Sequence, residues 1–144
     1  EKVEEFAKTI APRPEAQELI NICKEAGYTT IILSGTMKQI AESFRARLGI
    51  DLSYTCSEIV FREDGTFEDI ANDKDEGPSK LRIFERVCSE HGVDPSETIM
   101  VGDGGNDLWV FQKTKKAIQI GDHEPLKEYA WKQVQSLSEI KDLL

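Results

Sequence analysis

The 144-residue sequence has little of what marks membrane proteins or nucleic-acid-binding proteins. No apolar run approaches the ~20 residues that cross a bilayer, and no segment resembles a signal peptide. Lysine and arginine number 18 against 27 aspartates and glutamates, which gives a net charge of −9. A nucleic-acid surface needs clustered positive charge. We therefore predict a soluble globular protein with no membrane partner and no nucleic-acid partner.

Cysteine and histidine are also scarce. The three cysteines, Cys23, Cys56 and Cys88, show no paired spacing. Free thiols in the reducing cytoplasm are the expectation, and metal ligation or catalysis is the less favoured alternative. Of the two histidines, His91 stands near an expected helix end, where a surface position is favoured. His123 stands in a loop that could border a site and contact a substrate.

Patterns typical of helices and strands alternate along the chain, which has the length of one domain with a real core. Helices are expected at 14–26, 37–48, 77–91 and 107–113, strands at 28–33, 98–102, 117–120 and 134–137, a β-hairpin at 57–69 and a polar loop at 72–77. This alternation predicts an α/β fold: a three-layer, Rossmann-like parallel sheet with helices on both faces and a small hairpin insertion. Residues 1–10 have helical spacing but end at Ala11-Pro12-Arg13-Pro14.

The segment Thr98–Asp107 carries the most chemical information. Its apolar and β-branched residues predict a buried strand that ends at Gly102-Asp103-Gly104-Gly105-Asn106-Asp107. In open α/β sheets, ligands bind at the carboxyl ends of the strands. Carboxylate oxygens at such a turn suit a hard cation such as Mg²⁺. The alternative is a plain strand-to-helix turn, since Asn, Asp and Gly favour turns in any case.

A second segment, Thr29–Thr36, is also a β-branched run, and it ends at Ser34-Gly35 before a helical pattern. The Ser34 hydroxyl and the backbone N–H groups that follow it would form an anion site at a helix N-terminus. Simple capping of the helix by Ser34 is the equally favoured alternative.

A third segment, Gly77-Pro78-Ser79-Lys80, opens a helix. A lysine in a first helical turn is electrostatically misplaced, because the helix dipole favours anions there. Lys80 is therefore either an ordinary surface lysine or a positive charge directed at a transferring phosphate.

Together and in this order, the three segments resemble the haloacid dehalogenase superfamily of phosphatases. Ile31-Ile32-Leu33-Ser34-Gly35 looks like its second motif, Lys80 its third, and Val101–Asp107 its fourth. The phosphoserine phosphatase branch is the most similar, because there a similar proline-rich helix leads into the Ser-Gly strand and a hairpin precedes the lysine helix. The resemblance implies that residues 11–144 form the α/β core domain and residues 1–10 the tail of a helical cap or a linker.

The resemblance also implies a magnesium cofactor and a role for each carboxylate. Asp103 would be a direct Mg²⁺ ligand with a part in catalysis. Asp107 would hold the cation through water or orient Lys80.

The same resemblance implies a phosphate site. Lys80 would pair with phosphate oxygens as a catalytic residue, and Ser34 and the N–H of Gly35 would bind the same group from the opposite side. Asn106 would contact phosphate or substrate. A small phosphorylated metabolite would be the substrate, with phosphoserine the best single expectation.

The family's first motif, a strand that ends in Asp-x-Asp and carries the nucleophilic aspartate, is missing. The nearest match, Arg62-Glu63-Asp64-Gly65-Thr66, has Arg62 in place of the nucleophile and follows the second motif, so a hairpin turn is the favoured interpretation. In the family fold the missing strand lies between the strands that end at Ser34 and at Gly102. A missing N-terminal segment or another chain would have to fill that position.

Two hypotheses of different class follow. In the first, the parent protein is a Mg²⁺-dependent phosphomonoesterase that acts through an aspartyl-phosphate, and this chain alone is an inactive fragment. In the second, the chain is a non-catalytic, phosphatase-like binding or regulatory module. The retained charge cluster favours the enzyme, and the missing nucleophile favours the module.

Overall fold

The structure is a computed structural model that describes residues 2–72 and 75–144. The chain divides into two compact units, with the boundary between residues 74 and 75. In the part of the chain that the structure describes, no helix is both long enough and apolar enough to span a membrane.

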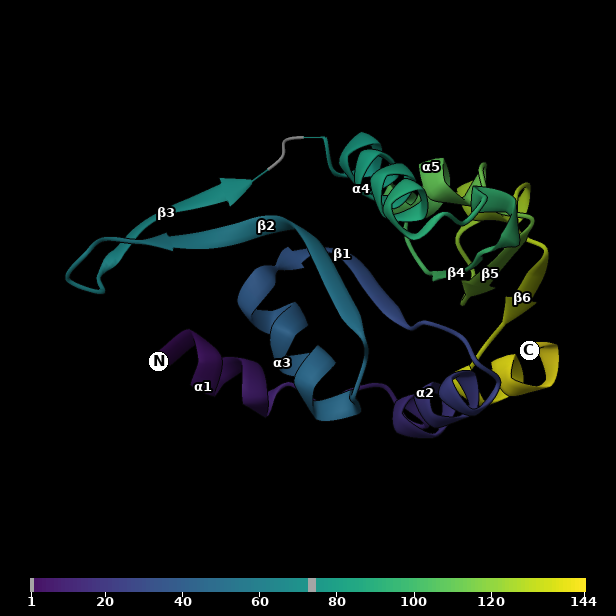
Figure 1. Ribbon diagram of the computed structural model, residues 1–144, viewed down its shortest axis with the longest axis horizontal. Coiled ribbons are helices and arrows are strands. Elements are labelled where there is room, and N and C mark those ends of the chain that lie inside the picture. Colours follow the sequence, from purple (N-terminus) through teal and green to yellow (C-terminus); the bar gives the residue numbers. More distant parts are fainter. Residues whose placement is uncertain (1, 73–74) are drawn as a thin grey trace. The chain divides into compact units, whose positions relative to one another are not determined.

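In its described residues, 2–72, the first unit combines three helices with a mixed sheet (Figure 1). Its elements are α1 (Lys2–Thr9), α2 (Ala16–Glu25), β1 (Ile31–Met37), α3 (Lys38–Leu48), β2 (Leu52–Phe61) and β3 (Phe67–Asn72). The sheet order is β1-β2-β3, with β1 parallel to β2 and β2 antiparallel to β3. Helix α3 connects the two parallel strands and packs against both of them. The helical pattern of the N-terminal segment is confirmed by α1.

The predicted hairpin is confirmed by β2 and β3, which Figure 1 shows as a long antiparallel pair. Gly65 has a φ of 81°, the left-handed conformation that its turn requires. The Asp64 carboxylate accepts hydrogen bonds from both the N–H and the hydroxyl of Thr66, at 2.9 and 2.6 Å. These bonds hold the pKa of Asp64 below its ordinary value. The segment that resembles a displaced first motif is therefore a turn.

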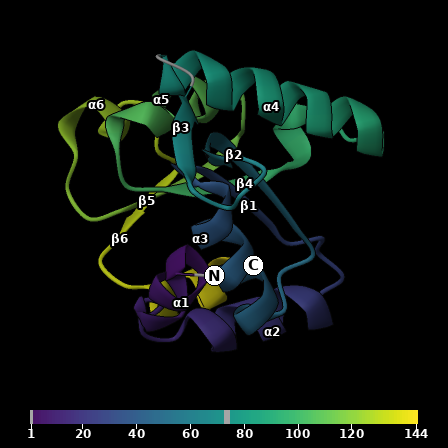
Figure 2. The ribbon, with the colours of Figure 1, turned by 90° about the vertical axis from the view of Figure 1, so that its left-hand side faces the viewer.

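The second unit contains an all-parallel sheet of order β4-β5-β6. Its elements are α4 (Glu76–His91), η1 (Pro95–Glu97), β4 (Ile99–Gly102), η2 (Gly105–Asp107), α5 (Leu108–Phe111), β5 (Lys116–Ile120), α6 (Glu124–Lys127), β6 (Lys132–Val134) and η3 (Leu137–Leu143), where η denotes a 3-10 helix. Figure 2 shows the full length of α4, with α5 beside it. Phe111, Ala117 and Leu126 form the centre of the core.

Two sequence predictions for this region need correction or restriction. The short strand predicted at 134–137 exists but lies earlier, at 132–134, where it pairs with β5; Ser136 already begins a capping box with Glu139 that opens η3. The polar loop predicted at 72–77 is shorter, since β3 reaches Asn72 and α4 starts at Glu76; residues 73 and 74 of that loop lie outside the described residues.

The α/β class and the parallel strand pairing are confirmed, with two three-stranded sheets in the described residues. β1 and β4 are each the terminal strand of their own sheet. The prediction of one continuous three-layer sheet depends on a strand that would join them, and it stays a prediction, as does the division at residues 10 and 11.

Candidate active site

The loop after β4 closes on the side chain of Asp107. Oδ2 of Asp107 accepts hydrogen bonds from the backbone N–H groups of Asp103 and Gly104, at 3.0 and 3.2 Å. A Cβ atom on Gly102 would lie only 2.5 Å from the same oxygen. Glycine at the end of β4 therefore lets the carboxylate come back against the strand.

Lys80 is directed at this loop from α4, where it is the fifth residue. Its Nζ lies 2.6 Å from Oδ1 of Asp107, and the two side chains are only 6% and 5% exposed. The ammonium also donates to Oδ1 of Asn106 at 3.2 Å. The alternative of an ordinary surface lysine is therefore wrong. This geometry agrees with the interpretation that Asp107 orients Lys80.

Asn106 has a partner that the sequence did not reveal. Its Nδ2 donates a hydrogen bond of 2.9 Å to Oε2 of Glu76, the first residue of α4. The one available signal was spacing: Glu76 and Lys80 are one helical turn apart, and side chains at that spacing share a face.

The donor set around Asp103 fits a magnesium site that is completed from elsewhere. Asp103 is exposed directly after the end of a strand. Among residues 2–72 and 75–144, no group of three or more His, Cys, Asp or Glu side chains could hold a metal ion. Mg²⁺, however, keeps several waters and needs only one or two carboxylates besides substrate phosphate. Because both oxygens of Asp107 already accept protein hydrogen bonds, contact through water suits this residue better than direct ligation.

The expected position of Ser34 and Gly35 at a helix N-terminus was wrong. β1 continues through both residues to Met37, and α3 begins only at Lys38. The β-branched run keeps pairing with β2, in a register that becomes irregular between Ser34 and Met37. An anion at this segment would therefore depend on the Ser34 hydroxyl and the irregular backbone instead of a helix dipole.

Local hydrogen bonds fix this irregular segment. The Ser34 hydroxyl oxygen accepts from the N–H of Thr36 at 3.1 Å, so its O–H stays a donor for another group. The Oγ of Ser57, a buried residue of β2, lies 3.0 Å from the carbonyl oxygen of Gly35 and 3.0 Å from Oδ1 of Asn72. Sequence patterns gave no signal for the role of Ser57.

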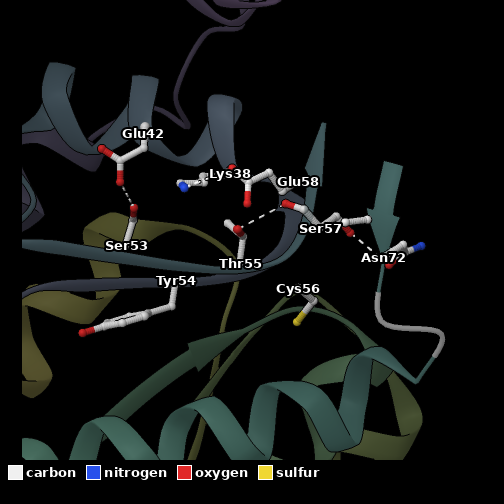
Figure 3. Close-up of a pocket in the computed structure, with 10 residues that line it drawn as sticks. Lys38, Glu42, Ser53, Tyr54, Thr55, Cys56, Ser57, Glu58 and Asn72 are labelled. Carbon is white, nitrogen blue, oxygen red and sulfur yellow. Dashed lines mark hydrogen bonds and ion pairs between the residues drawn. The ribbon is translucent and has the colours of Figure 1, made fainter. Parts of the chain in front are cut away.

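A polar cavity of about 500 Å³ lies on the α3 side of β2 and is also lined by β3. Figure 3 shows Glu42 of α3 and Ser53 of β2 joined by a hydrogen bond at this cavity, whereas Tyr54 and Cys56 point away to the opposite face of β2. Hydrogen bonds from Ser53 and then Arg45 hold the pKa of Glu42 below its ordinary value. None of the site residues predicted from the sequence lines this cavity.

His123 does lie beside the loop that follows β4, as its position in the sequence suggested. Its Nε2 would lie 3.4 Å from a Cβ on Gly105. The fully buried Gln119 donates a hydrogen bond of 3.0 Å from Nε2 to the His123 carbonyl and so holds this turn. A substrate contact by His123 stays a prediction.

The cysteines are free thiols, as predicted. Burial raises the pKa of Cys23 and of Cys88 above the ordinary thiol value. A raised pKa disfavours the reactive thiolate at neutral pH. These two cysteines therefore lack the environment of a nucleophile.

Known proteins resemble the chain over most of its length. A family model described as haloacid dehalogenase-like hydrolase matches residues 1–113. Phosphoserine phosphatase of Methanocaldococcus jannaschii is 28% identical over 130 residues, which cover 90% of this chain and 61% of the relative. Phosphoserine phosphatase of Albidiferax ferrireducens is 30% identical over 122 residues, which cover 81% of this chain and 51% of the relative. The chain thus spans between about half and three fifths of the length of these curated relatives.

Solved structures agree with this similarity. An apo phosphoserine phosphatase matches with a TM-score of 0.86 and 28% identity, over 99% of this chain and 72% of the other. A structure described as a phospho-aspartyl intermediate analogue of phosphoserine phosphatase matches with a TM-score of 0.85 and 27% identity, over 99% of this chain and 69% of the other.

Proposed function

The chain belongs to the haloacid dehalogenase-like hydrolase family, and we propose that it forms the phosphate-binding and cation-binding part of a phosphomonoester hydrolase. The observation that carries the proposal is the buried ion pair of Lys80 and Asp107, whose atoms Nζ and Oδ1 are 2.6 Å apart beside the loop that follows β4. Burying two charges is expensive unless their geometry is excellent. The pair has a clear function if Asp107 holds the ammonium of Lys80 in the position where it binds a phosphate.

Each polar group has a task in phosphoryl transfer. Lys80 offers N–H donors to the equatorial phosphate oxygens, where negative charge is spread in the transition state. Because Ser34-Gly35 resembles the family's second motif, we propose that these residues also bind phosphate, and that Asn106 contributes a polar contact. A bound Mg²⁺, held by Asp103 and through water by Asp107, would supply further positive charge to the phosphate.

Phosphoserine is the substrate that we propose. The support is the consistent description of the relatives as phosphoserine phosphatases and the similarity over 90% of this chain to one of them. For an anionic substrate the net charge of −9 is unfavourable, so capture has to come from Lys80 and the cation and not from the global field. The three free thiols are consistent with our proposal of a cytoplasmic protein.

The nucleophile of the proposed reaction is an aspartate that these 144 residues do not provide at the expected place. No aspartate precedes Asp51 in the sequence, although the second motif lies at 31–35. We propose that an additional segment or a second polypeptide supplies a strand ending in Asp-x-Asp. Its aspartate would attack the phosphorus and form an aspartyl-phosphate, as in the analogue that the matching structure describes.

The proposal is tested by hydrolysis of phosphoserine by the complete gene product that contains this chain, with Mg²⁺ present. Asp103→Asn should lower kcat by roughly 100-fold or more, because a group that stabilises transition-state charge is typically worth that much. Asp94→Asn is the matched control, since Asp94 caps η1 and asparagine caps equally well. Equal turnover in the two variants would exclude Asp103 from the reaction.

A second result of the same assay separates the two classes of function. Hydrolysis that is lost on chelation and restored by Mg²⁺ supports the enzyme. Phosphoserine or phosphate binding without any turnover in the complete gene product would instead indicate a non-catalytic module.

A further inference from the structure

We propose that Glu76 is a positioning residue that fixes the amide of Asn106 and, through this amide, the ammonium of Lys80. The inference rests on the proposed function for its catalytic consequence, but the network itself is a property of the second unit. Glu76 and Lys80 stand on the same face of α4, one turn apart. Asn106 bridges them, with Nδ2 2.9 Å from Oε2 of Glu76 and Oδ1 3.2 Å from Nζ of Lys80.

The charges of the two neighbours determine the orientation of the amide. An ammonium group can only donate hydrogen bonds, and an ionised carboxylate can only accept them. A reversed Asn106 would place its NH₂ group against the ammonium of Lys80 and its carbonyl oxygen against the carboxylate of Glu76. Both contacts would be repulsive. The carboxylate at position 76 therefore selects the orientation in which Oδ1 faces Lys80.

This orientation gives Lys80 a second fixed acceptor besides Asp107. A flexible lysine that is held by one acceptor can still rotate about it, whereas two acceptors fix the direction of the remaining N–H. With Asp107 at 2.6 Å and Asn106 at 3.2 Å, the remaining N–H of Lys80 is the donor available to a phosphate oxygen. Loss of the acceptor at position 76 would free the Asn106 amide to rotate and would loosen this direction.

Packing at the next residue keeps Glu76 within reach of Asn106. A Cβ on Gly77 would lie 2.4 Å from Cδ1 and 2.6 Å from Nε1 of Trp109, so the first turn of α4 lies directly against this indole. The contact holds the start of α4 beside α5, whose preceding 3-10 turn carries Asn106. This packing therefore keeps the Glu76 side chain within hydrogen-bond distance of Asn106.

The test uses two substitutions at position 76 in the complete gene product. Glu76→Ala removes the acceptor, whereas Glu76→Gln removes the charge and adds an NH₂ group but keeps one acceptor oxygen, which Lys80 still selects by requiring Oδ1 of Asn106 on its own side. Glu90→Ala is the matched control, because Glu90 lies in the last turn of the same helix, in an exposed pair with Arg86 at 3.7 Å. Thermal unfolding checks that each variant is folded, and Glu76→Gln provides a measurable variant if Glu76→Ala is not.

The first readout needs no catalytic activity. Limited acetylation with acetic anhydride, followed by peptide mass spectrometry, measures how fast Nζ of Lys80 reacts. We expect Lys80 to react several-fold faster in Glu76→Ala than in the wild type, with Glu90→Ala unchanged and Glu76→Gln within about twofold of the wild type, because an amide oxygen still accepts the bond. Equal labelling of Lys80 in Glu76→Ala and Glu90→Ala would overturn the proposal, whether or not the protein is a phosphatase.

The second readout is the kinetics of phosphoserine hydrolysis. Glu76→Ala should lower kcat by about 10- to 100-fold with little change in KM, since misplacement of a catalytic group acts mainly on the transition state. Glu76→Gln should restore most of the rate. A wild-type protein without turnover, combined with faster labelling of Lys80 in Glu76→Ala, would refute the proposed function and leave the network supported. Normal kcat in Glu76→Ala would refute the positioning role.

Discussion

Lys80 and Asp107 are 27 residues apart in the sequence, yet their charged atoms lie 2.6 Å apart in a nearly solvent-free position. Asp107 is held in turn by two backbone N–H groups of the loop after β4. The pair therefore fixes the register between α4 and the end of β4. Substitutions can separate the contribution of the pair to folding stability from its contribution to phosphate binding.

Removing one member of the pair should destabilise the protein strongly. Lys80→Met should lower the free energy of unfolding by about 3–5 kcal/mol, because the carboxylate of Asp107 is left buried without its counter-charge. Urea denaturation at neutral pH measures the change. Lys113→Met is the control: Lys113 and Glu85 are about half exposed and 3.8 Å apart, so its loss should change stability by no more than ~1 kcal/mol. Similar losses of unfolding free energy in the two variants would show that burial of the Lys80–Asp107 pair does not make its removal more costly.

Substitution by alanine should destabilise the protein at Gly102 but not at Gly104. Gly102→Ala places a methyl group 2.5 Å from Oδ2 of Asp107, and this overlap should reduce the free energy of unfolding by about 1–3 kcal/mol. Gly104→Ala should be tolerated within ~0.5 kcal/mol, because its nearest contact would be Oδ1 of Asn106 at an ordinary 3.7 Å and its φ is −135°. Denaturation curves of the two variants give the comparison, and equal stability would show that Asp107 moves aside freely.

Ser34 should matter for anion binding and not for stability. Ser34→Ala in the complete gene product should weaken inhibition by vanadate by roughly 10-fold or more, since a hydrogen bond to a charged group is worth about 1.5–3 kcal/mol. Ser89→Ala, on the exposed side of α4, should leave the inhibition constant unchanged. An unchanged constant in Ser34→Ala would remove Ser34 from the proposed phosphate site.

Acid stability should depend on Asp51. The backbone N–H and then the hydroxyl of Thr30 donate to its carboxylate, at 2.8 and 2.7 Å, and with Lys24 they lower the pKa of Asp51 from 3.8 to about 2. Because the folded-state pKa is the lower one, the stabilisation is complete above pH 3.8 and is lost as the pH falls through about 2.

Urea denaturation midpoints between pH 2 and pH 7 test this assignment for the wild type and Asp51→Asn. The variant should have the lower midpoint at pH 7, and the two curves should converge as the pH falls through the range in which Asp51 takes up its proton. A constant difference across the whole pH range would show that Asp51 acts by packing and not by its charge.

The sequence predicted the α/β class and the hairpin because these depend on local patterns. Apolar runs between glycines mark the strands, and Asp64-Gly65 suits a tight turn. It could not reveal that β1 passes through Ser34, because strand pairing with β2 overrides the local turn preference of Ser and Gly. A side chain that only connects other side chains, such as Glu76, has no sequence pattern of its own.

Because Trp109 packs against Gly77, tryptophan fluorescence can report on the start of α4. The chain has two tryptophans, and Trp131 lies instead near the ammonium groups of Lys116 and Lys132, 5.5 and 5.6 Å from its ring centre. Trp131→Phe would leave Trp109 as the single indole of these 144 residues. Trp109 is 46% exposed, so its emission is sensitive to water as well as to the start of α4. Fluorescence of that variant would follow, in real time, the docking of the helix that carries Lys80.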